Sequence, residues 1–213
     1  MNPVPNIDSA PLNRPPRVNN TSPSFQGGPA WQLPLRLLPP TCPVDSLLIG
    51  IVQRQRALLA VGAPKAEILG PYHPSMIIIA YPDQNEDGHA LSTLIANLFL
   101  RTPIPGTPEK AACLYVTYHL TQWQIDPSPE TYANLPEWHR ARPSQVMTPH
   151  PTWVTQMVFG KLRDRVIANQ ERYATEEFHA LYLVSLNINW PRGPMDIFVI
   201  DGNDMSLLDT ARR

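Results

Sequence analysis

Histidine and cysteine are the residues of this sequence best suited to nucleophilic, acid–base or metal chemistry. The histidines are His73, His89, His119, His139, His150 and His179, and the cysteines are Cys42 and Cys113. No two histidines stand four residues apart, the spacing that places a metal-binding pair on one helix face. Two thiols are too few for a disulfide framework or a four-thiolate metal site. We therefore expect neither a metal ion nor any other cofactor.

Cys113 and His119 come closest to a nucleophile and its base. Six residues along a helix turn by about 600°, so two side chains at this spacing leave the helix on different faces. We interpret His119 as a hydrogen-bonded core histidine and Cys113 as a small buried apolar residue. The sequence also lacks a nucleophile elbow, a phosphate-binding loop and a paired-histidine zinc motif. It predicts no catalytic residue, and whether the protein is an enzyme stays open.

Six residues are candidates for a patch that binds a partner or a ligand: His150, Trp153, Arg163, Asp164, Arg165 and Trp190. The basic residues around Asp164 would bind an anion or a partner in the functional interpretation. The structural interpretation is a solvated helix face on which Arg163 or Arg165 ties neighbouring loops together. We favour the structural one, because the five fixed donors of arginine suit that task.

The tryptophans also allow two interpretations. Trp123, Trp138, Trp153 and Trp190 each lie close to a proline or a polar turn. Aromatic side chains of this kind line ligand pockets in some proteins. More often they are core anchors whose indole N–H donates to a loop carbonyl, and we expect all four in the core.

The charge balance argues against autonomous DNA binding. The 213 residues carry 17 Lys and Arg against 18 Asp and Glu, a net charge of −1, whereas a duplex-binding domain normally has a marked basic excess. The first twenty residues lack the apolar centre of a signal peptide, and no apolar run approaches the ~18 residues of a membrane span. We expect a soluble intracellular protein, in the nucleus or the cytoplasm, without membrane contact.

Proline divides the chain. Eleven of the 26 prolines fall within residues 1–43. Proline fixes φ and lacks an N–H donor, so such a stretch resists both helix and sheet. We predict a disordered proline-rich arm over residues 1–36, with residues 31–38 able to pack on the domain. A single domain follows over residues 37–200, and residues 201–213 form a C-terminal tail.

The domain is predicted to be all-α. Apolar residues recur at three- and four-residue steps after Pro43 up to Gly62, from about Gly88 to Arg101, and from Thr107 onward. Shorter helices are expected after Ser128 and His150, over residues 161–173 and over residues 175–189. The run MIIIAY at 76–81 is the one strand candidate, with PMDIFVID at 194–201 as its only possible mate, and we favour a buried helical or extended segment for it.

The helix that begins near Thr107 should be the buried centre of the domain. Tyr115, His119 and Trp123 share one face with other apolar residues, and further apolar residues cover much of the remaining circumference. A helix of this kind is stable only when neighbours cover it. Gln122 and Gln124 are expected on its outer arc.

Several longer motifs carry a family resemblance. They are LPPTCPVDSLL (38–48), AEILGPYHPS (66–75), LYVTYHLTQWQIDPSPETYANLPEW (114–138), RPSQVMTPHPTWV (142–154), KLRDRVI (161–167) and SLNINWP (185–191). In this order they resemble a fungal domain of unknown function that commonly follows the basic leucine zipper of ascomycete bZIP regulators. After Trp153 many relatives have an acidic residue and a Trp-Pro step, where this chain reads TQMVFG (155–160).

The resemblance implies a regulatory or interaction module of a transcription factor, without established catalytic or ligand-binding residues to transfer. The basic region and zipper are absent from this sequence, so the chain is expected not to bind specific DNA by itself. Its partner would be another regulator or a small effector molecule. The alternative is a stand-alone protein of a biosynthetic gene cluster that uses the helical fold as a small-molecule binder, cyclase or isomerase.

Overall fold

The computed structural model describes residues 28–82, 89–201 and 204–208 of the chain. The helices are α1 (Pro43–Ala60), α2 (Lys65–Leu69), α3 (Ile77–Ala80), α4 (Ala90–Leu100), α5 (Thr107–Ile125), α6 (Pro129–Ala133), α7 (Pro143–Met147), α8 (Thr152–Gln156), α9 (Gly160–Ala168), α10 (Gln170–Tyr173) and α11 (Glu176–Ser185). The 3₁₀ turns are η1 (Ala30–Gln32), η2 (Glu137–His139) and η3 (Pro194–Ile197), and the strands are β1 (Phe198–Asp201) and β2 (Asp204–Leu207). The predicted all-α class is confirmed, with one small hairpin added.

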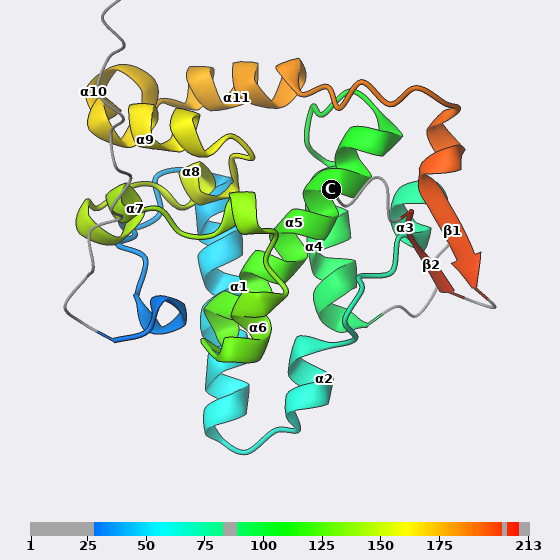
Figure 1. The fold of residues 1–213 in the computed structure, drawn as a ribbon, viewed down its shortest axis with the longest axis horizontal. Helices are drawn as coiled ribbons and strands as arrows, with labels where there is room; N and C mark the ends of the chain where they lie inside the picture. Colours follow the sequence, from blue (N-terminus) through cyan, green and yellow to red (C-terminus); the bar gives the residue numbers. More distant parts are fainter. Residues whose placement is uncertain (1–27, 83–88, 202–203, 209–213) are drawn as a thin grey trace, which may run out of the picture.

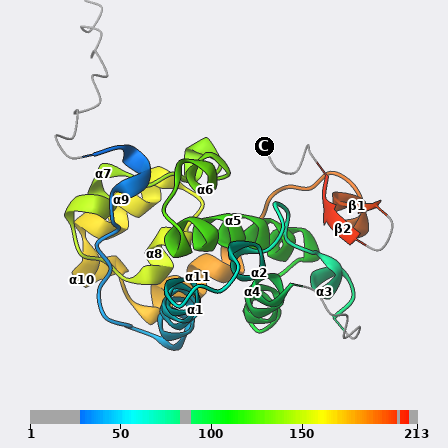
Figure 2. The ribbon, with the colours of Figure 1, turned by 90° about the horizontal axis from the view of Figure 1, so that it is seen from below.

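Helix α5 runs through the middle of the molecule (Figures 1 and 2). It contacts α1, α3, α4, α6, α8, η3 and β2, and every residue from Leu114 to Trp123 is buried. The prediction of a central helix is therefore confirmed. The outer arc expected at Gln122 is wrong, because neighbours surround the helix there. Gln122 is buried, and its Nε2 donates to the carbonyl oxygen of Leu69 at 2.9 Å.

The start of α5 and of α1 follows the proline positions. Pro43 and Pro108 lie in the first turns of these helices, where a missing N–H costs nothing. The N-caps are Cys42 and Gly106, and neither makes a side-chain cap hydrogen bond. The buried Asp45 carboxylate instead accepts from the backbone N–H and hydroxyl of Thr41, at 3.2 and 2.7 Å.

Gly70 allows α2 and α5 to approach closely. Its φ of 76° lies in the left-handed region, and a Cβ at this position would be 2.6 Å from the Tyr118 hydroxyl oxygen. That hydroxyl donates to the carbonyl oxygens of Leu69 and Pro71 at 2.9 and 2.8 Å. Only glycine fits both the backbone conformation and the short distance.

The hairpin forms one end of the molecule and α7, α9 and α10 the other (Figure 2). Strands β1 and β2 pair antiparallel, with Phe198 opposite Leu207. The strand candidate at 76–81 contains the helix α3, as favoured. Its possible mate, 194–201, instead supplies η3 and β1, and β1 pairs with the residues that follow it. The domain boundary expected at residue 200 falls within this hairpin. Met205 and Leu207, expected in a tail, are buried in the main core because β2 packs against α5.

The segment 28–40 is attached to the domain along its length. The Arg36 N–H donates to the Gln145 carbonyl and the Leu38 N–H to the His150 carbonyl, each at 2.9 Å. Leu35 packs against the small core cluster of Leu120, Trp123 and Leu135. The contacts with the domain therefore involve residues 31–38, while residues 1–27 lie outside the described part of the chain.

Candidate functional site

The six candidate patch residues do not share one surface. His150, Trp153 and Arg163 are almost fully buried, at 0%, 2% and 1% exposure. Asp164 is half-buried and Arg165 exposed. Trp190 packs against the main core cluster, whereas Trp153 belongs to a second cluster with Val154, Met157, Val166 and Ile167. The structure thus separates residues that the sequence grouped.

Arg163 lies inside the domain and holds a loop in place. Its Nη1 donates to the His139 carbonyl at 3.2 Å and to Gln145 Oε1 at 3.0 Å, and its Nη2 donates to the Trp138 carbonyl at 3.1 Å. Burial lowers the pKa of Arg163 to about 10, so the side chain stays charged at neutral pH. Its contacts are those of the structural interpretation, an arginine that ties carbonyls of a neighbouring loop.

Asp164 connects α9 to α7. It forms an ion pair with Arg142 and accepts the Ser144 hydroxyl at 2.6 Å. Burial raises the pKa of Asp164, but the hydrogen bonds from Arg142 and Ser144 outweigh this effect and leave the pKa below its ordinary value. This carboxylate is engaged by its own chain.

His150 and Trp153 fix the turn before α8. The His150 carbonyl and N–H bond to the segment at 36–38, and burial lowers the pKa of its imidazole. The backbone N–H of Trp153 donates to Asp45 Oδ1 at 2.7 Å. The Trp153 indole stacks on the His179 ring, with the ring centroids 4.5 Å apart. Trp153 thus joins α8 to α1, and His150 joins the turn before α8 to the segment at 36–38.

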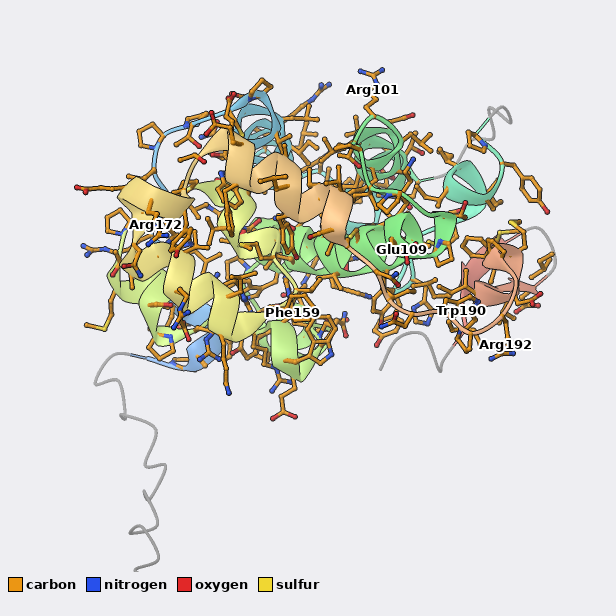
Figure 3. All side chains as sticks on the ribbon, turned by 90° about the horizontal axis from the view of Figure 1, so that it is seen from above. Arg101, Glu109, Phe159, Arg172, Trp190 and Arg192 are labelled. Atoms are coloured by element: carbon orange, nitrogen blue, oxygen red, sulfur yellow. The ribbon has the colours of Figure 1, made fainter. Side chains whose placement is uncertain are left out.

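An apolar groove of about 660 Å³ opens at the start of α9. We call it the aromatic groove. Its lining comes from one face of α5 between Glu109 and Val116, from Trp138, from residues 158–161, and from residues 186–188 with Trp190. Glu109, Phe159 and Trp190 are labelled in Figure 3, at the start of α5, before α9 and after α11.

Backbone and side-chain hydrogen bonds hold the four segments that line the aromatic groove. Glu109 Oε1 accepts the Ile188 N–H at 3.1 Å, which ties the start of α5 to the chain after α11. The indole N–H of Trp190 donates to the Gly193 carbonyl at 3.1 Å. The Val158 N–H donates to the Tyr182 hydroxyl at 3.0 Å. The buried Arg163 holds the Trp138 carbonyl on the remaining side.

The expectation that all four tryptophans belong to the core is half right. Trp123 and Trp153 are buried, and the Trp123 indole donates to the Trp31 carbonyl at 2.9 Å. Trp138 is 45% exposed and Trp190 is partly exposed, and both line the aromatic groove. The difference arises because η2 and the segment after α11 lie at the surface, where the elements of the core cover these two indoles only in part.

Cys113 lines the aromatic groove, whereas His119 does not. Burial raises the pKa of the Cys113 thiol to about 12, which keeps it protonated and a poor nucleophile. His119 is fully buried, and its Nδ1 lies 3.2 Å from Gln122 Oε1. The expected separation of these two residues, and the core position of His119, are confirmed.

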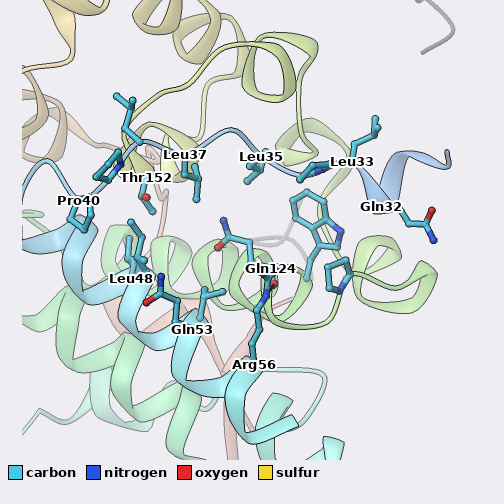
Figure 4. A pocket seen from close by; sticks show the side chains of 17 residues that line it. Gln32, Leu33, Leu35, Leu37, Pro40, Leu48, Gln53, Arg56, Gln124 and Thr152 are labelled. Carbon is cyan, nitrogen blue, oxygen red and sulfur yellow. Dashed lines mark hydrogen bonds between the residues drawn. The ribbon is translucent and has the colours of Figure 1, made fainter. Parts of the chain in front are cut away.

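A second hollow, of about 480 Å³, lies between the segment 32–40 and α1 (Figure 4). Leucines and prolines of the segment face Leu48 and Val52 of α1 across it. Arg56 crosses its lower edge, where its Nε donates to the Gln124 carbonyl at 2.8 Å. This hollow marks incomplete packing of the docked segment rather than a cluster of reactive groups.

Sequence reasoning did not identify Glu109, Phe159 and Lys161 as groove residues. No local pattern identifies them, because the groove is made from segments far apart in the chain.

Within residues 28–82, 89–201 and 204–208, no group of three or more His, Cys, Asp or Glu side chains is arranged to hold a metal ion. None of the helices described is long and apolar enough to cross a membrane.

The comparisons with known proteins give one match. Residues 118–210 match the family described as a domain of unknown function, DUF3425. This region begins within α5 and continues to the end of the described chain, less than half of the sequence. It includes the part of the groove wall formed by Trp138, residues 158–161 and Trp190, whereas the wall from Glu109 to Val116 precedes it. No curated protein and no solved structure matches the chain.

Proposed function

We propose that this chain is a regulatory binding module associated with transcription, and that the aromatic groove is its binding site. Two findings support the proposal. The motifs between residues 38 and 191 resemble the domain that follows the zipper in fungal bZIP regulators, and residues 118–210 match a family described as a domain of unknown function. In this proposal the chain acts in the nucleus or the cytoplasm on another regulator or in response to a small effector.

The aromatic groove is the observation that carries a binding role. Phe159 is 60% exposed and Trp138 is 45% exposed, although burying an aromatic side chain is favourable. Surface apolar groups that cluster in a concave site commonly mark a place where another molecule binds. Here the lining comes from four segments held in place by hydrogen bonds, so the site is formed before any partner arrives.

A reporter assay tests the regulatory role. The full chain fused to a heterologous DNA-binding domain should change transcription of a reporter gene, and Phe159→Ala should reduce that change. Val61→Ala is the matched control, since Val61 is 81% exposed at the end of α1 and lies outside the groove. Equal reporter output from the fusion and from the DNA-binding domain alone would contradict the proposal.

Specific DNA recognition is not part of this function. With a net charge of −1, the chain should bind duplex DNA weakly, without sequence preference and less as salt rises. Titration of a labelled duplex at physiological salt measures this. Nanomolar, sequence-dependent binding would overturn it.

The dimensions of the groove also support the second candidate, a small-molecule protein of a biosynthetic cluster. Its volume of about 660 Å³ lies in the ~300–1,000 Å³ range of small-ligand pockets. Glu109 would then be the first candidate for a proton-transfer group, because its carboxylate lies at the groove. Turnover of a cluster metabolite that is lost in Glu109→Gln would favour this function, while ligand binding without conversion favours the regulatory one.

A further inference from the structure

The aromatic groove has an apolar lining with very few charged side chains. Its lining holds four aromatic side chains, Tyr115, Trp138, Phe159 and Trp190. Val116 and Ile188 contribute aliphatic surface. Flat rings favour a ligand that is itself flat, because aromatic rings gain from stacked and edge-on contacts. The volume of about 660 Å³ suits one molecule of drug-like size.

The two charged residues at the groove differ in what they already contact. Glu109 lies in the first turn of α5, where a negative charge is stabilised, and its carboxylate accepts the Ile188 N–H. Lys161 is exposed, and among the described residues its ammonium group takes part in no ion pair or hydrogen bond. Glu109 keeps its negative charge but is bonded to its own chain, so Lys161 is the charged side chain of the lining that has no bond to another described residue.

We propose that the aromatic groove binds a small aromatic molecule that carries one anionic group. Its rings pack against Trp138, Phe159 and Trp190, and its anionic group pairs with the Lys161 ammonium. This inference rests on the proposed function in taking the groove as the binding site, and it adds the chemical class of the ligand. The thiol of Cys113 contributes only apolar surface.

A pair of fluorescent probes tests the proposal on the full chain. Anilinonaphthalene sulfonate is an aromatic monoanion, and N-phenylnaphthylamine has closely similar rings without the charge. We expect the sulfonate to bind the folded protein saturably at one site, and Lys161→Met to weaken it about 2- to 5-fold, the contribution typical of an exposed ion pair. Binding of the neutral probe should not change in Lys161→Met.

Two further variants assign the site. Ala112→Phe places a ring within the groove lining and should abolish saturable binding of both probes, and Phe159→Ala, at an exposed position, should weaken both without affecting folding. Arg165→Met is the control, because it removes the same charge from α9 at a residue outside the lining. A loss in Arg165→Met equal to that in Lys161→Met would overturn the role of Lys161.

The proposal on the ligand and the proposal on regulation fail separately. Sulfonate binding that persists in Ala112→Phe and Phe159→Ala, or no saturable binding at all, overturns the ligand class. The regulatory function still holds in that case if Phe159→Ala reduces the reporter response. Probe binding that depends on the groove, together with a reporter response indifferent to Phe159→Ala, supports the ligand site and contradicts the regulatory function.

Discussion

Replacement of Arg163 should unfold the domain far more readily than replacement of its neighbour Arg165. Arg163 is 1% exposed and makes three hydrogen bonds, to the carbonyls of Trp138 and His139 and to Gln145. Hydrogen bonds to a charged group contribute about 1.5–3 kcal/mol each. Alanine would remove all three, although Gln145 Oε1 would keep the backbone N–H of Arg142 as a donor. We therefore expect a loss near the lower end of the combined range, about 4–5 kcal/mol of unfolding free energy, which is a large share of a domain's ~5–15 kcal/mol.

Urea melts followed by circular dichroism measure this difference. Arg165→Ala serves as the control, since Arg165 is exposed on the same helix and should cost a few tenths of a kcal/mol. Arg163→Lys should recover little, because an ammonium group cannot reproduce the planar fork of a guanidinium. A cost below about 1 kcal/mol for Arg163→Ala would refute the structural role and return Arg163 to the list of binding residues.

Three further predictions concern stability. Leu120→Ala should cost about 2–5 kcal/mol in a urea melt, from lost burial and the cavity left behind, whereas Gln124→Ala, half-buried on the same helix, should cost only a few tenths; equal costs would contradict the central position of α5. Burial and the nearby Arg163 charge lower the pKa of His139 to about 3 in the folded protein. In the unfolded chain the histidine pKa is ~6.5, so as the pH falls below that value the unfolded chain binds a proton at His139 that the folded chain does not. The unfolding free energy should therefore fall by about 1.4 kcal/mol per pH unit between pH ~6.5 and ~5, and His139→Gln should flatten that slope; an unchanged urea midpoint at the two pH values would contradict it. Residues 1–27 are rich in proline, so their deletion should leave the melting temperature within a few degrees. A deletion that extends through residues 28–40 should lower the melting temperature clearly, because that segment bonds to the domain. Equal melting temperatures for the two deletions would refute the role of the segment 28–40.

The local elements of this protein follow from its sequence. The proline that opens α1 and the one that opens α5 predict where these helices begin, within one residue of the observed caps. The apolar circumference of α5 predicts its central place, because a helix without a polar face needs neighbours on all sides. These signals act over one or two turns of chain, so they can be recognised without knowledge of distant contacts.

Tertiary structure decided the rest. Gln122 looks like a surface residue in sequence, yet it is buried because the carbonyls of Leu69 and Pro71 lie beside α5 and accept its amide hydrogens. Residues 204–207 alternate polar and apolar side chains, but four residues are too short a run to predict a strand, and they become one because β1 supplies a partner edge beside them. The aromatic groove, too, is formed by segments that are distant in the sequence.

The sequence by itself determined which side chains are capable of binding, but the fold decided which of them are accessible. Trp153, Arg163 and Trp190 were equally eligible as partner or ligand residues. Packing of α8 and α9 buried the first two, while the chain after α11 left Trp190 at the aromatic groove, beside Phe159 and Lys161. Burial depends on the elements that cover a residue from elsewhere in the chain, and spacing along the sequence carries no information about that cover.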